Sequence, residues 1–233
     1  MFAAPAWLPR TIVIALAIWL ATIASVQLWD DAIWEALSER HSMIARRTGA
    51  LGDLPLALTQ RIYLHLLTGE LDAAASLVEE IQRATETTGS DLAPYAAVGL
   101  AALRGRETEA EYLIERTRTE VTRRGEGIGL SVLDWAAAVL YNGLGRYEEA
   151  CQAALGVAAH DLNPSMWIMA ELIEAAVRAG TPEVAADARR RLGSIARATG
   201  TDWVVGMASR SEALLAAAGR GNAAAAPTTP CGE

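Results

Sequence analysis

Polar and apolar positions follow a helical period in long segments rich in Ala, Leu, Glu and Arg, and Gly and Pro fall between these segments. These four residue types favour helix interiors, whereas Gly and Pro disfavour them. Sandwiches and barrels depend on aromatic and β-branched strands, and only 6% of the residues here are aromatic. The pattern therefore predicts an all-α chain of helices joined by short turns.

A Gly followed five residues later by an Ala marks the turn between two helices at four places. The pairs are Gly69 with Ala74, Gly105 with Ala110, Gly145 with Ala150, and Gly180 with Ala185. The intervals between these glycines are 36, 40 and 35 residues. The other helices end at Gly49, Gly89, Gly125 and Gly200, since Gly readily takes the left-handed conformation after a last helical turn. Each unit is then a helix, a tight turn, a second helix and a slightly longer loop.

Units of two helices and about 34 residues are the design of tetratricopeptide (TPR) repeats, in which each pair buries its apolar face by stacking on its neighbours. The best match is LDWAAAVLYNGLGRYEEACQAALGVAAHDLNP, which starts at Leu133. We predict an all-α, right-handed TPR-like solenoid of about five helix pairs over residues 11–219. We expect residues 1–10 to be a poorly ordered N-terminal extension and residues 220–233 to be a disordered Ala/Pro/Thr tail.

Residues 11–29, TIVIALAIWLATIASVQLW, contain no charged residue and allow two interpretations. A bilayer span needs about 20 apolar residues, so the segment is long enough for a membrane anchor. Its N-terminal flank holds only Arg10, and no clean small-residue cleavage site follows. Alternatively, it is the first helix of the first repeat, with Asp31 in the turn, Ala36 five residues later, and Asp30 or Asp31 as the next N-cap.

A division between bulky and small side chains favours the buried helix. The bulky residues form one arc, which we expect to face the second helix pair: Ile12, Val13, Leu16, Trp19, Leu20, Ile23 and Val26. The opposite side carries mostly Ala, with Thr22 and Ser25. A lipid-facing helix has no need of this division. We therefore expect a membrane association to be absent and the protein to be cytoplasmic, with a membrane anchor through residues 11–29 as the alternative.

The charge balance excludes several functions. The net charge is −8, which argues against a nucleic-acid surface because phosphate binding needs clustered cations. All 20 basic residues are Arg, so the chain can form no P-loop and no Schiff base through Lys.

Cysteines and histidines give no metal-site or disulfide pattern. Cys151 and Cys231 are 80 residues apart, and His41, His65 and His160 share no ligand spacing. We also find no nucleophile and base at a catalytic spacing. The sequence therefore predicts no cofactor, no metal and no catalytic residues, in a protein of a reducing compartment.

The concave face of a TPR stack is lined by the first helix of each pair, and one stripe of these helices carries polar and aromatic side chains. The candidate groove residues are Tyr63, Tyr95, Trp135, Asn142, Trp167 and Glu174. They could hold a partner helix or a small-molecule inducer. Aromatic stripes at helical spacing more often pack repeat on repeat, so we favour packing as their role.

Several segments, taken in order, resemble the helical-repeat region of large ATP-binding LuxR-type (MalT-like) transcriptional regulators of actinobacteria. They include LWDDAIWEALSERH, LPLALTQRIYLHLLTGELDAAASLVEE, TGSDLAPYAAVGLAALRGRE and ELIEAAVRAGTPEVAADA. The similarity extends from about Ile18 to Gly219. In that family an ATPase precedes the repeats and a helix-turn-helix follows them, and the repeats sense an inducer or a partner.

The resemblance implies a sensor or protein-interaction module, and ATP hydrolysis and DNA binding are not carried over to this chain. We expect a non-enzymatic fragment or stand-alone remnant of such a regulator, with a protein partner or an inducer on the concave face. The alternatives are a membrane-anchored repeat scaffold and a small-molecule-binding regulatory domain. The oligomeric state stays open.

Overall fold

The computed structural model of the chain describes residues 10–158 and 164–225. The side chain of Ile12, the residues His160 and Cys231, and most of the predicted extension and tail lie outside this description. Within it the chain is all-helical, as predicted. The helices are α1 (Arg10–Gln27), α2 (Asp31–Thr48), α3 (Leu54–Thr68), α4 (Leu71–Thr88), α5 (Tyr95–Leu103), α6 (Glu107–Arg124), α7 (Gly127–Gly143), α8 (Tyr147–Ala158), α9 (Pro164–Arg178), α10 (Pro182–Thr199) and α11 (Asp202–Ala225).

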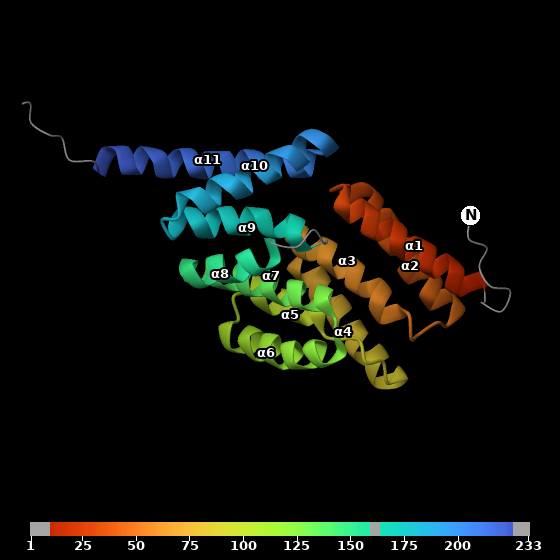
Figure 1. The fold of residues 1–233 in the computed structure, drawn as a ribbon. Coiled ribbons are helices and arrows are strands. Elements are labelled where there is room, and N and C mark those ends of the chain that lie inside the picture. Colours follow the sequence, from red (N-terminus) through yellow and green to blue (C-terminus); the bar gives the residue numbers. More distant parts are fainter. Residues whose placement is uncertain (1–9, 159–163, 226–233) are drawn as a thin grey trace, which may run out of the picture.

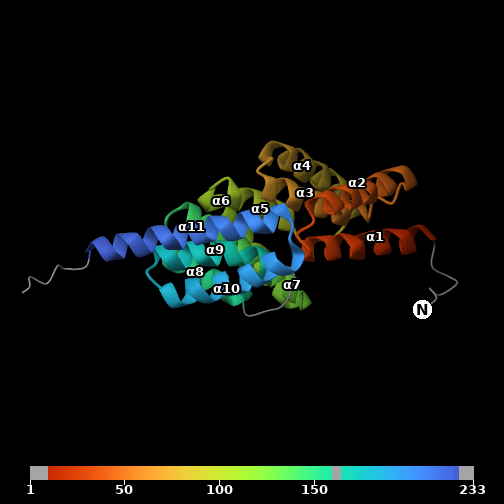
Figure 2. The same cartoon turned by 90° about the horizontal axis from the view of Figure 1, so that it is seen from above.

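Consecutive helices pack as pairs, and the pairs are stacked. α3 packs on α5, α5 on α7, α7 on α9 and α9 on α11, so the odd-numbered helices from α3 to α11 form one continuous row. Figure 1 shows the stack from α6 upward to α11, with α1 and α2 to one side. Seen from above, α1 and α11 extend in opposite directions from the middle of the molecule (Figure 2).

All eight glycines predicted to end helices or form turns adopt the left-handed backbone conformation, with φ between 63° and 82°. At six of the eight, the amide of the residue after the glycine donates to the carbonyl five residues earlier, as Glu70 does to His65 and Arg146 does to Tyr141. This bond closes a Schellman motif, which satisfies a carbonyl that the helix end would leave free. The four alanines of the pattern are fully buried, as suits small residues between packed helices.

The prediction for the first turn is wrong by two residues. Trp29, not Asp31, has the positive φ of 56°, and the amide of Asp30 donates to the carbonyl of Ser25, as in the glycine turns. The residue five positions later is therefore the fully buried Trp34, whereas Ala36 is exposed. Asp30 is the N-cap of α2, as expected, and its carboxylate accepts from the amide of Ile33 at 2.9 Å.

The predicted orientation of α1 is right only in part. The buried residues come from both predicted sides: Thr22 and Ser25 are almost fully covered, and so is Val26 of the bulky arc. Leu16 and Leu20 of that arc are half exposed, and most alanines of the small side are exposed as well. The hydroxyls of Thr22 and Ser25 donate to carbonyls of their own helix, which removes the cost of burying them. α1 packs against α2.

Among the described residues, no helix has the length and apolar character needed to cross a bilayer. At the other end of the chain, α11 continues to Ala225, beyond the predicted end of the repeat domain at residue 219.

A turn glycine and a nearby helical glycine form a matched pair that tests the turn assignment. We expect Gly145→Ala to lower the free energy of unfolding by about 1–2 kcal/mol, because an L side chain is disfavoured at its φ of 75°. Gly143→Ala, two residues earlier, should raise it by about 0.4–1 kcal/mol, since Gly143 is helical and its surroundings are open. Urea denaturation of both variants measures this. Equal changes of the same sign would contradict the turn assignment.

Candidate functional site

Six aromatic rings, contributed by helices far apart in the sequence, form a continuous cluster inside the stack. This aromatic cluster consists of Trp29, Trp34, Tyr63, Trp135, Trp167 and Trp203. Aromatic pairs at centroid distances of about 4.5–7 Å attract one another beyond the area that they bury. The cluster therefore links the first helix pair to the last helices.

Trp34 is at the centre of this link. Its ring stacks on Trp167 at 5.8 Å and 7°, and on Trp203 at 6.2 Å. Its indole nitrogen donates to the carbonyl of Gln60 at 3.1 Å, so this fully buried side chain is also hydrogen-bonded. The start of α11 consequently lies over the end of α1 and the start of α2 (Figure 1).

The inner cavity is a hollow of about 420 Å³ beside the aromatic cluster. α1 lines one side of it with Trp19, Ile23 and Val26. The opposite sides come from the N-terminal parts of α3, α5, α7 and α9, and from the residues just before α5 and α7. Volumes of about 300–1,000 Å³ with a mostly apolar lining are typical of sites for small molecules.

Three of the six predicted groove residues line the inner cavity: Tyr63, Tyr95 and Trp167. Trp135 lies behind them, where it contacts both Tyr63 and Trp167 and is only 2% exposed. Trp135 therefore has the packing role that the sequence analysis favoured for the aromatic stripe. Trp167 and Tyr63 combine both roles, because they stack on each other and still border the cavity.

The other two predicted residues lie outside the cavity lining. Asn142 donates to the carbonyl and to the carboxylate of Glu171, at 3.0 Å and 2.9 Å. Burial raises the pKa of the Glu171 carboxyl. Glu174 forms ion pairs with Arg178 at 3.2 Å and Arg210 at 2.5 Å. These groups therefore connect helices and do not take part in the cavity.

A polar network closes one end of the inner cavity. The hydroxyl of Tyr95 donates to a carboxylate oxygen of Glu126 at 2.5 Å, and the hydroxyl of Tyr63 donates to the carbonyl of Tyr95 at 3.0 Å. Burial is the main cause that raises the pKa of both phenols, and at Tyr95 the bond to Glu126 adds to it. Gly129 makes this approach possible, because a Cβ there would lie 2.2 Å from the Tyr95 hydroxyl oxygen.

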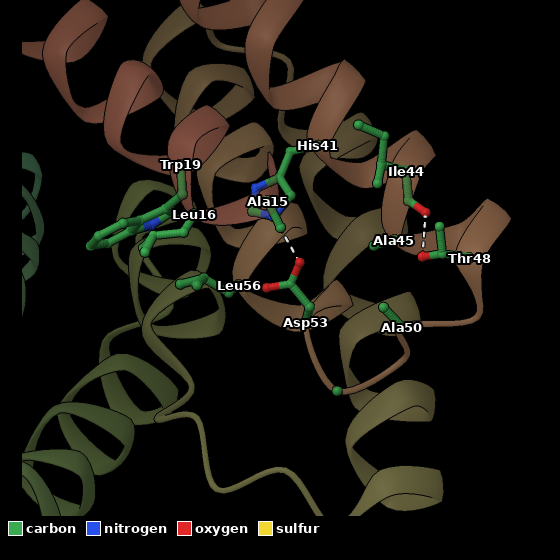
Figure 3. A pocket seen from close by; sticks show the side chains of 11 residues that line it. Ala15, Leu16, Trp19, His41, Ile44, Ala45, Thr48, Ala50, Asp53 and Leu56 are labelled. Atoms are coloured by element: carbon green, nitrogen blue, oxygen red, sulfur yellow. Dashed lines mark hydrogen bonds and ion pairs between the residues drawn. The ribbon is translucent and has the colours of Figure 1, made fainter. Parts of the chain in front are cut away.

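A second hollow of about 470 Å³ lies between α1, α2 and the start of α3 and shares Trp19 and Leu56 with the inner cavity. Figure 3 shows the imidazole of His41 directed at Asp53, whose carboxylate lies 2.9 Å from His41 Nε2. His41 is buried, so this contact fixes the loop before α3 against α2. The hollow has no residue of the predicted groove.

Sequence reasoning missed two parts of the inner cavity. The first is α1, because its inner side was assigned to packing on the second helix pair. The second is the first turn of α7, with Glu126 and Gly129. The glycines of residues 125–129, GEGIG, are a usable signal in the sequence, since Gly129 is needed where Tyr95 approaches the backbone.

Among the described residues, no group of three His, Cys, Asp or Glu side chains could hold a metal ion. The cavity combines aromatic and aliphatic walls with one polar end, which suits binding better than acid–base chemistry. Comparisons with known protein families, curated proteins and solved structures give no match.

The buried phenol of Tyr63 gives a pH-dependent test. The unfolded chain ionises Tyr at a pH of about 10, and the folded chain resists this, so stability is present below pH 10 and is lost as the pH rises above it. We expect the free energy of unfolding to fall by up to about 1.4 kcal/mol per pH unit on account of this residue.

Urea denaturation at a series of pH values between about 8 and 11 measures the slope. Tyr63→Phe should reduce the slope above pH 10, whereas Tyr112→Phe, at an exposed position, should leave it unchanged. An unchanged slope in Tyr63→Phe would show that its phenol is not protected by the fold.

Proposed function

We propose that this chain is a non-enzymatic helical-repeat module that senses a small, mainly apolar molecule in the inner cavity. The observation that carries the proposal is the cavity itself, where inner helices from four helix pairs and α1 contribute walls to one hollow of about 420 Å³. A ligand that contacts all of these helices stabilises their arrangement by its binding free energy. Binding would therefore stabilise the arrangement of the whole stack.

The proposal includes a TPR-like, right-handed stack and a relation to the repeat region of LuxR-type regulators. It is supported by the repeated turn glycines and buried alanines, and by the segments that resemble that region. In such a module the ligand state is passed to a protein partner, and we place this activity in the cytoplasm. Cys151 is a free, buried thiol, as suits a reducing compartment.

The half-buried valines of α7 provide the test. Val132 lines the inner cavity, and Val139 lies on the same helical stripe seven residues later, outside its lining. We expect Val132→Phe to lower the affinity for a neutral apolar probe, N-phenyl-1-naphthylamine, about tenfold or more, because the added ring fills the hollow. Val139→Phe should bind as the wild type does.

Fluorescence titration of the probe measures both affinities, and thermal melts monitor the fold of each variant. The proposal fails if the wild type does not bind the probe, or if both variants lose binding equally.

A further inference from the structure

The inner cavity has one charged residue in its lining, Glu126, and none of the described arginines belongs to it. Its remaining walls are apolar or uncharged. Binding an anionic ligand here would remove its charge from water without pairing it with a cationic side chain, and this costs free energy. The lining therefore disfavours carboxylates and phosphates as ligands.

Negative charge dominates the surroundings of Glu126. Its carboxylate lies 2.8 Å from the guanidinium of Arg124, which also lies 3.6 Å from Glu120 and 4.0 Å from Asp91. Three carboxylates thus share one guanidinium. Arg124 is 17% exposed, whereas Glu126 is 37% exposed and borders the cavity. A ligand at this end meets the acidic side of the cluster.

The start of α7 is the one feature that favours an anion here. A helix N-terminus carries a partial charge of about +0.5. Glu126 is the N-cap residue of α7 and places a full negative charge at the same point. The acidic cluster therefore outweighs the partial charge of the helix.

Two aromatic rings of the lining can also favour a cation. Trp19 and Tyr95 stack on no other ring among the described residues, in contrast to Tyr63 and Trp167, which stack on each other. The phenol of Tyr95 donates to a carboxylate, which makes its ring face more electron-rich. Such faces attract ammonium groups.

We propose that the inner cavity binds an organic cation, with an ammonium group beside Glu126, Trp19 and Tyr95 and an apolar body against Ile23 and Val132. This inference rests on the proposed function, because it names the ligand class of the same cavity. The carboxylate supplies charge complementarity, and the apolar walls supply most of the buried area.

Three probes with one shared body test the inference: benzyltrimethylammonium, its uncharged isostere neopentylbenzene, and the anion phenylacetate. Tryptophan fluorescence reports binding, since Trp19 and Trp167 line the cavity. We expect the cation to bind about five- to thirty-fold more tightly than the isostere, as a cation desolvated against aromatic faces does. Its affinity should fall as ionic strength rises from about 0.01 M to 0.5 M, whereas that of the isostere should not.

Glu126→Gln removes the charge and keeps an oxygen that can accept from Tyr95. We expect this variant to lose most of the preference for the cation and to bind the isostere as before. The matched control is Glu86→Gln, which removes the same charge from an exposed position on α4, outside the lining of the cavity.

The outcomes separate the two proposals. If the isostere or phenylacetate binds as tightly as the cation, or if Glu126→Gln and Glu86→Gln behave alike, the inference is overturned and the binding function stands. If none of the three probes binds and N-phenyl-1-naphthylamine does not bind either, both proposals fail.

Discussion

The stacking of Trp34 on Trp167 joins the second helix of the chain to the ninth and continues through Trp203 to the last helix. A stack of helix pairs joined only to their neighbours would leave its first and last units far apart. The aromatic cluster instead supplies contacts between residues more than 130 positions apart in the sequence. Trp29 takes the place of a turn glycine because its ring is needed here, and its burial and edge contact with Trp203 offset a backbone conformation that costs about 1–2 kcal/mol.

The inner cavity follows from the same contacts. Since Trp34 holds the α1–α2 pair against the later helices, the inner side of α1 faces the row of odd-numbered helices across a gap that its side chains only partly fill. Trp167 belongs to both features, because it stacks in the cluster and lines the hollow. A ligand in the hollow therefore contacts the structural element that holds the two ends of the chain together.

The local part of this architecture could be predicted from the sequence. A left-handed helix end strongly favours Gly, and a close helix approach favours Ala, so the eight glycines and four alanines marked turns and contacts correctly. The helical period also selected Tyr63, Tyr95 and Trp167, which line the inner cavity. Asn142 and Glu174 share the same stripe but form hydrogen bonds and ion pairs between helices, and spacing alone does not distinguish these roles. The turn at Trp29 and the mixed set of residues that α1 buries depend on contacts with distant helices, which no local pattern encodes.

The coupling between Trp34 and Trp167 tests this account most directly. A double-mutant cycle with Trp34→Leu and Trp167→Leu, measured by urea denaturation, keeps apolar side chains at both sites and removes the stacked rings. The account predicts a coupling free energy of about 0.5–1.5 kcal/mol. A parallel cycle of Trp34→Leu with Val121→Ala on α6 should be additive within about 0.5 kcal/mol. Additivity in the first cycle as well would contradict the claim that the aromatic cluster holds the two ends of the stack together.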